Sequence, residues 1–230
     1  MLKTLKISAA ENDIGIVSDL HWNHDRDFIW GKRGFKNVQE SNETLIHRWN
    51  SYFTDRSIMF HLGDIIFNDP LGDNFKNLMR RLKFKQLYLL LGNHNSGQVQ
   101  VYKEALAAYG MPQADIDKGM EIYPLSYYVD GDPNKEVIFL PEYIEANING
   151  QRITLCHYPI ISHHKAGHGS WMLCGHSHGS CEFTNVQSGK GLRLDIGIES
   201  FGRPLNFREI KDFMAKREVI SFDHHHEKTT

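Results

Sequence analysis

The chain has 230 residues, and its 26 basic and 28 acidic side chains give a formal net charge of -2. This balance excludes bulk electrostatic attraction to nucleic acid or to an anionic membrane, so any such affinity must be local. Apolar residues make up 40% of the chain, which is enough for a sizeable core. The length suits one large α/β domain.

We expect neither a signal peptide nor a membrane span, because no apolar run approaches the roughly eighteen residues that a spanning helix needs. Three cysteines are too few, and odd in number, for a disulfide framework. A cytoplasmic protein is therefore expected. Residues 221–230 are polar and include three consecutive histidines, so we expect a disordered tail after a single domain formed by residues 1–220.

The first half of the chain predicts alternating strands and helices. Short apolar runs predict buried strands over residues 13–18, 57–62 and 86–91. Residues 22–40 are expected to form a loop. Ser41 is then expected to cap a helix, whose apolar face consists of Leu45, Ile46, Trp49 and Phe53. Two more helices are expected, one from Asp73 and one over residues 98–109 that ends at Gly110.

The second half predicts mostly strands. They are expected over residues 127–129, 137–140, 143–148, 152–157, 171–174 and 192–197. Asn149-Gly150 predicts a hairpin turn, and Asn206 with Glu209 predicts the capped start of a final helix to about residue 217. Together the two halves predict an α/β fold of two facing sheets flanked by helices.

Five short polar motifs end the predicted strands or follow them directly. They are Asp19-Leu20-His21, Gly63-Asp64, Gly92-Asn93-His94, Cys156-His157 and Gly175-His176-Ser177-His178. Each motif alone could cap a strand or pair with backbone groups. Polar side chains at several strand ends gather at one edge of an α/β sheet, and carboxylates, an amide and imidazoles are ligands for divalent metals. The five motifs together therefore predict a site for two metal ions, with one shared carboxylate.

With these motifs the chain resembles the calcineurin-like metallophosphoesterase superfamily, whose pattern is D-x-H, G-D, G-N-H-(D/E), H and G-H-x-H. It is most similar to a group of small bacterial and phage phosphoesterases. Their first motif, S-D-x-H-x-x-H, corresponds to residues 18–24 here, and their closing segment resembles Leu194-Asp195-Ile196-Gly197 followed by Arg203-Pro204. The resemblance covers residues 14–210.

The resemblance implies a four-layer α-β-β-α sandwich of two mixed sheets. It implies that Asp19, His21 and His178 hold one metal ion and that Asn93, His157 and His176 hold the other. Asp64 would bridge the two ions, and His94 would face the substrate as a second catalytic residue. Manganese is the first expectation for both ions, with Fe, Zn, Ni or Co as alternatives. Cys156 and Cys174 are expected to be buried strand residues rather than ligands.

Two divalent ions, two carboxylates and a bridging hydroxide leave one net positive charge, which suits an anionic phosphoester. The expected reaction is in-line attack of a metal-bound hydroxide on phosphorus, with His94 as proton donor to the leaving oxygen. The family usually has Asp or Glu after its Gly-Asn-His motif, whereas this chain has Asn95. An amide cannot stabilise an imidazolium as a carboxylate does, which weakens the expectation for His94 as an acid.

Two loops are candidates for substrate binding. In residues 22–36, aromatic and basic side chains alternate. The aromatic rings could stack on a base and the basic groups could pair with a phosphate. Alternatively, the aromatic side chains could only hold the loop in place. Residues 158–171 join two ligand motifs and so must pass near the site, although they could equally form a mobile polar loop. The candidate substrate-binding residues are His24, Arg26, Asn95, His164 and His168.

The expected function is hydrolysis of a small, nucleotide-like phosphodiester or of a nucleic-acid end. A phosphomonoesterase is the alternative within the same chemistry. A protein phosphatase is less favoured, because Gln98 and Val99 replace the extension that follows Gly-Asn-His in the Ser/Thr phosphatases. A non-catalytic scaffold of the same fold is a third alternative, disfavoured because every ligand position is filled. The sequence does not distinguish oligomeric states.

Overall fold

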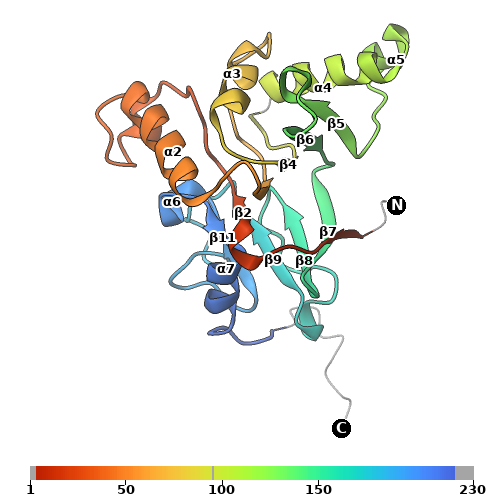
Figure 1. Cartoon of the computed structure of the whole chain (residues 1–230). Coiled ribbons are helices and arrows are strands. Elements are labelled where there is room, and N and C mark those ends of the chain that lie inside the picture. The colour runs from red at the N-terminus through yellow and green to blue at the C-terminus, as the bar shows by residue number, and fades with distance from the viewer. Residues whose placement is uncertain (1–3, 95, 221–230) are drawn as a thin grey trace.

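The computed structural model of the chain describes residues 4–94 and 96–220, which form two mixed β-sheets flanked by helices (Figure 1). This confirms the expected α/β arrangement of two sheets. The predicted tail, 221–230, and Asn95 lie outside the described residues.

The first sheet has six strands in the order β11-β2-β3-β4-β6-β5. They span Leu205–Asn206, Ile14–Val17, Ile58–His61, Gln86–Leu89, Glu136–Phe139 and Leu125–Tyr128. The four central strands are parallel, and the edge strands β11 and β5 are antiparallel to them. The register pairs Val17 with His61 and His61 with Leu89. The loops after β2, β3 and β4 therefore leave the sheet at the same edge.

The second sheet has five strands in the order β1-β7-β8-β9-β10. They span Leu5–Ile7, Tyr143–Ile148, Gln151–Cys156, Trp171–Cys174 and Arg193–Asp195. Strands β7 and β8 form the predicted hairpin, and both turn residues, Asn149 and Gly150, have the positive φ that such a turn requires. Strands β8, β9 and β10 are parallel, so their carboxyl ends also meet at one edge.

Helices cover the outer face of the first sheet. The longer ones are α2 (Val38–Tyr52), α3 (Asp73–Arg81) and α4 (Ser96–Tyr109), and their buried residues, Trp49, Phe75 and Val101 among them, share a core with that sheet. A second core lies between the two sheets and contains Phe60 and Leu155. Helix α7 (Phe207–Met214) adds side chains to this second core, which holds the two sheets together.

Backbone hydrogen bonds join the two sheets at the ends of their strands. The Ser18 amide, just after β2, donates to the Ile196 carbonyl after β10 at 3.2 Å, and the Ile198 amide donates to the Ser18 carbonyl at 3.0 Å. Within the second sheet, the Gly175 amide after β9 donates to the His157 carbonyl after β8 at 2.9 Å. The loops that carry the five polar motifs therefore lie side by side.

One predicted helix start is wrong. Helix α2 begins at Val38, and its cap is Asn37, whose side chain accepts a hydrogen bond from the Glu40 amide. Ser41 lies within the first turns of the helix and is buried. The segment predicted as a loop over 22–40 also contains a short helix, α1 (Asp27–Trp30). The capping box of Asn206 and Glu209 is confirmed, although α7 ends at Met214.

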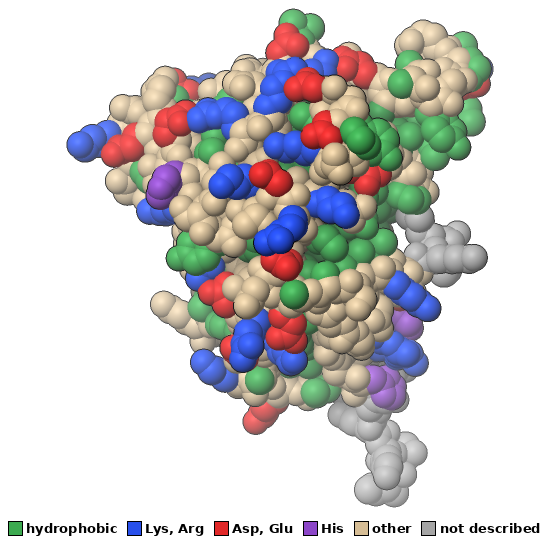
Figure 2. All heavy atoms as spheres, in the orientation of Figure 1, with side chains coloured by type: hydrophobic (Ala, Val, Ile, Leu, Met, Phe, Trp, Pro, Cys, Tyr) green, Lys and Arg blue, Asp and Glu red, His purple; other side chains and the backbone are tan. Residues whose placement is uncertain are grey.

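Further short elements complete the described fold. These are α5 (Gln113–Asp117), α6 (Ile198–Phe201) and the 3-10 helices Glu11–Asp13, Val129–Gly131 and Ala166–His168. Over the described ranges, no helix combines the length and the apolar character needed to cross a membrane. On the face seen in Figure 2, basic and acidic side chains are interspersed, as the balanced composition leads one to expect.

Candidate metal centre

Both sheets deliver polar side chains to one place. Asp19, Asp64 and Asn93 follow the parallel strands β2, β3 and β4 of the first sheet. The imidazoles of His157 and of the Gly175–His178 motif follow β8 and β9 of the second. Since the loops after these strands are joined by backbone hydrogen bonds, the ligands expected from distant segments gather between the ends of the two sheets.

Most of these residues have a left-handed backbone conformation. Positive φ angles occur at Asp19 (58°), His21 (48°), Asp64 (54°), His176 (66°) and His178 (48°). For a residue other than glycine this conformation costs about 1–2 kcal/mol, and such residues concentrate at functional sites, where the surrounding structure holds them in place. The fold therefore tolerates local backbone strain at the residues that carry most of the expected ligands.

The Asp64 carboxylate lies between two imidazoles. Its Oδ1 accepts a hydrogen bond from the His94 amide at 2.7 Å, which leaves Oδ2 at 3.6 Å from both His21 Nε2 and His157 Nε2. Two atoms that bind one metal ion at about 2.0–2.2 Å lie roughly 3–3.5 Å apart. The spacing thus allows Oδ2 to share one ion with each imidazole.

His21 also has a buried nitrogen without a partner. Its Nε2 makes no hydrogen bond to any described group and is shielded from solvent. Burial, together with the nearby cationic groups, lowers the pKa of His21 far below its usual value, so the ring is neutral. A buried neutral imidazole with a nitrogen that makes no hydrogen bond suits a metal ligand.

The His157 ring has a defined tautomer. Its Nδ1 lies 2.9 Å from the Leu62 carbonyl, which can only accept, so Nδ1 carries the proton. Burial lowers the pKa of His157 and keeps the ring neutral. The bare lone pair of Nε2 then faces Asn93 Oδ1 at 2.9 Å. Two hydrogen-bond acceptors at this distance repel each other unless a cation lies within reach of both. Two ligands of one metal ion are placed in this way.

Asp19 is a second buried carboxylate. It accepts hydrogen bonds from the His176 amide, and one carboxylate oxygen lies within 4.8 Å of ligand atoms of both His21 and His178. Burial raises the pKa of Asp19 to about 8, because desolvation of the carboxylate outweighs the attraction of His178. Together with Asp64 and His157 it makes a further group able to hold an ion. Two buried carboxylates this close avoid mutual repulsion either when one is protonated or when both bind a cation.

A clamp of Arg33 and Glu199, which the sequence analysis did not identify, positions His178. Glu199 Oε1 lies 2.9 Å from His178 Nδ1 and 2.5 Å from an Arg33 nitrogen. Burial opposes ionisation of Glu199, but these two partners outweigh it and hold its pKa below the usual range. The hydrogen bond with Glu199 in turn raises the pKa of His178. With Nδ1 bonded to Glu199, only Nε2 remains for a metal ion.

Asp195, in the segment that carried the family resemblance, holds the loop of His176 and His178. It is fully buried. Its carboxylate accepts hydrogen bonds from Ser177 Oγ at 2.5 Å and from the Gly179 amide at 2.9 Å. The loop after β9 is therefore fixed at its centre, between the two imidazoles.

His94 and His24 lie in an aromatic group beside the ligands. The half-buried His94 ring is 5.6 Å from the His21 ring and 5.1 Å from the Phe67 ring. His24 stacks on Phe67 at 3.6 Å, and its Nδ1 lies 3.3 Å from His21 Nδ1. Burial lowers the pKa of His24 to about 4, with help from His94 and from basic groups that include Arg26. The structure therefore brings His24 and His94 to the centre.

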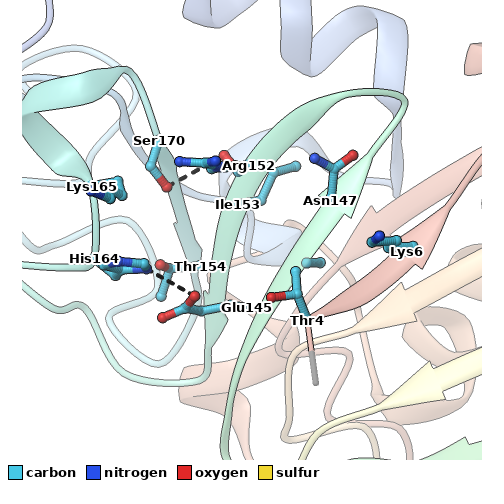
Figure 3. A pocket seen from close by; sticks show the side chains of 11 residues that line it. Thr4, Lys6, Glu145, Asn147, Arg152, Ile153, Thr154, His164, Lys165 and Ser170 are labelled. Carbon is cyan, nitrogen blue, oxygen red and sulfur yellow. Dashed lines mark hydrogen bonds and ion pairs between the residues drawn. The ribbon is translucent and has the colours of Figure 1, made fainter. Parts of the chain in front are cut away.

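The other described candidates for substrate binding, Arg26, His164 and His168, are all exposed. Arg26 is exposed at the start of α1. His164 forms an ion pair with Glu145 at 2.9 Å and lines a separate cavity of about 440 Å³, which contains none of the expected ligands (Figure 3). His168 is exposed in the 3-10 helix Ala166–His168 and does not line that cavity. Asn95 lies outside the described residues.

The cysteines agree with the sequence-based expectation. Cys156 and Cys174 are buried, and neither belongs to the groups able to hold an ion. Cys174 packs with Met172 on the second sheet. The donor set at the centre is therefore oxygen and nitrogen without thiolate.

No family model matches the chain. An uncharacterized protein of Methanocaldococcus jannaschii is 34% identical over 82 residues, which are 36% of this chain and 46% of that protein, so the match spans about half the length of this curated relative. A crystal structure of a protein of unknown function from Aquifex aeolicus superposes with a TM-score of 0.51 and 15% identity, covering 86% of this chain and 97% of the other. This likeness shows a shared fold.

Proposed function

We propose that the protein is a dimetal phosphoesterase with the calcineurin-like metallophosphoesterase fold, which hydrolyses a nucleotide-like phosphodiester. The observation that carries the proposal is the position of Asp64 Oδ2 at 3.6 Å from both His21 Nε2 and His157 Nε2. A carboxylate oxygen equidistant from two neutral imidazoles suits a ligand shared by two divalent ions. Two further observations support the division of ligands that the family resemblance implies. Ligand atoms of Asp19, His21 and His178 lie within 4.8 Å of one another, and Asn93 Oδ1 lies 2.9 Å from nitrogens of both His157 and His176.

When bound, such a pair of ions lowers the pKa of water and polarises a phosphoryl oxygen. The protein side chains position the reaction. Asp64 holds the backbone amide of His94 through Oδ1, which fixes the loop that carries the candidate acid. The His94 ring stands next to His21, within reach of a phosphoester bound at the ligands. Glu199 and Arg33 keep His178 in one tautomer.

The test is turnover of bis(p-nitrophenyl) phosphate and p-nitrophenyl phosphate, with Mn²⁺ and with a chelator. We expect metal-dependent hydrolysis by the wild type that is lost in His176→Ala and retained in His164→Ala, which removes a histidine from the separate cavity. A preference for the first ester supports the diesterase, and a preference for the second favours the monoesterase. Two bound metals without turnover of either ester would contradict the proposal and favour a non-catalytic scaffold.

A further inference from the structure

A large cavity opens beside the candidate metal centre. Its volume is about 840 Å³, and one wall is formed by His176, His178 and Glu199. Residues of α1 and of the turn after it, namely Phe28, Ile29 and Lys32, also line the cavity. A phosphate held at the ligands would therefore place one of its ester groups in this cavity.

Phe28 is the unusual residue of this wall. Its side chain is 54% exposed, although an aromatic ring gains about 1.5–3 kcal/mol when fully buried. It contacts the site through His24, whose ring lies 5.8 Å away and nearly perpendicular. His24 is itself stacked on Phe67, so the contact with His24 holds the Phe28 ring in position. The ring is thus anchored on one side and uncovered on another.

Lys32 adds a positive charge to the same wall. It is exposed, and within the described residues it takes part in no ion pair. Its neighbour in the chain, Arg33, is in contrast engaged by Glu199. A free ammonium beside an exposed ring suits a ligand that is both planar and anionic.

We propose that this cavity is a nucleoside subsite, in which Phe28 stacks on the base of the substrate while Lys32 attracts its phosphate. This inference rests on the proposed function, because it assigns the ester group of the same substrate. It predicts selectivity for esters that carry a base. Stacking of a base on an aromatic side chain is worth about five- to a hundredfold in affinity.

Two esters with the same leaving group test the subsite. They are thymidine 5′-(p-nitrophenyl phosphate) and methyl p-nitrophenyl phosphate, which differ only in the group that stays on phosphorus. We expect the wild type to prefer the thymidine ester in kcat/KM by about five- to a hundredfold. The preference should disappear in Phe28→Ala and persist in Phe28→Tyr. It should also persist in Tyr109→Ala, which removes an aromatic side chain that is 70% exposed on another helix.

A binding measurement separates the subsite from the catalytic proposal. NMR titration of the full chain with 5′-AMP and with ribose 5-phosphate compares two phosphates that differ in the base. Tighter binding of 5′-AMP that is lost in Phe28→Ala supports the subsite, even if neither ester is hydrolysed and the phosphoesterase proposal fails. Equal binding of both probes by the wild type, or a preference for 5′-AMP that survives in Phe28→Ala, would overturn the subsite. Metal-dependent turnover of the methyl ester would still support the phosphoesterase proposal in that case.

Discussion

Glu199 is the residue whose role is most open to a direct test. It holds His178 Nδ1 and is itself held by Arg33, so it would act on a bound metal ion only through His178. Partners of this kind typically change metal affinity by about 10–100-fold when they are removed. We expect Glu199→Gln to weaken Mn²⁺ binding by that factor, measured by competition with a chelating dye.

Glu43→Gln is the matched control for that experiment. It also breaks an ion pair between glutamate and arginine, with Arg81 on the outer helices, but it touches no expected ligand. Unchanged metal affinity in Glu199→Gln, or an equal loss in both variants, would show that Glu199 does not position His178.

Proton release should accompany metal binding. Burial raises the pKa of Asp19 to about 8, and the hydrogen bond with Glu199 raises the pKa of His178. Below those pKa values both groups carry a proton that a metal ion must displace, so affinity should rise with pH and level off once pH exceeds about 8. Calorimetry in buffers of different ionisation enthalpy counts the released protons. Affinity that stays constant between about pH 6 and 8 would contradict this titration.

The residue types of the site could be predicted from sequence, but not all of their partners. The ligands follow apolar runs in short motifs with a recognisable order, so each carries a local signal. Glu199 and Arg33 are 166 positions apart and meet only in the folded chain. Asp195 lay in a segment that the family resemblance had marked, but its hydrogen bonds to the loop after β9 depend on tertiary structure.

At the scale of single elements, turns rather than strands decide the geometry of the centre. Gly63 has a φ of 106°, and a β-carbon there would lie 2.7 Å from His157 Nδ1 and 2.8 Å from the Gly92 α-carbon. Gly110 has a similar φ of 100° with nothing within 4 Å. The two glycines thus have a similar positive φ and differ in how closely other atoms surround them.

Alanine substitutions at Gly110 and Gly63 give a matched pair of predictions. Gly110→Ala should cost about 1–2 kcal/mol of unfolding free energy, the usual penalty for a left-handed residue. Gly63→Ala should cost more and should also abolish metal binding, because the added carbon displaces His157. Chemical denaturation measures the first effect and a metal titration the second. Equal losses of stability with intact metal binding in both variants would contradict the crowding at Gly63.

All strands except β1 and β11 were predictable because each is a short apolar run between polar segments. The start of α2 was predicted wrongly although the sequence held the relevant signal: Asn37 is followed three residues later by Glu40, as in a capping box. The edge strand β1 was not predicted, because Leu5–Ile7 is short and its pairing partner β7 lies more than a hundred residues away.

At the scale of the whole molecule, the candidate ligands join the two sheets. Asp19, Asp64 and Asn93 come from the first sheet, and His157 and His176 come from the second. Metal ions bound between them would stabilise the folded chain as a unit, by about 2.7 kcal/mol per site at a hundredfold excess over the dissociation constant.

Thermal unfolding measures this coupling. One site saturated to that degree should raise the melting temperature by roughly 5–10 °C for a chain of this size, and the same metal should have little effect on Asp64→Asn. His164→Ala serves as the control and should respond to the metal as the wild type does. No shift in the wild type at millimolar Mn²⁺ would argue against a metal centre between the sheets.

The central claim is that two divalent ions share Asp64, and anomalous diffraction from crystals soaked in Mn²⁺ tests it most directly. Two peaks about 3.5–4 Å apart, on either side of Asp64 Oδ2 and within bonding distance of His21 and His157, are the predicted result. A single peak, or two peaks without Asp64 between them, would contradict the shared carboxylate and with it the proposed dimetal chemistry.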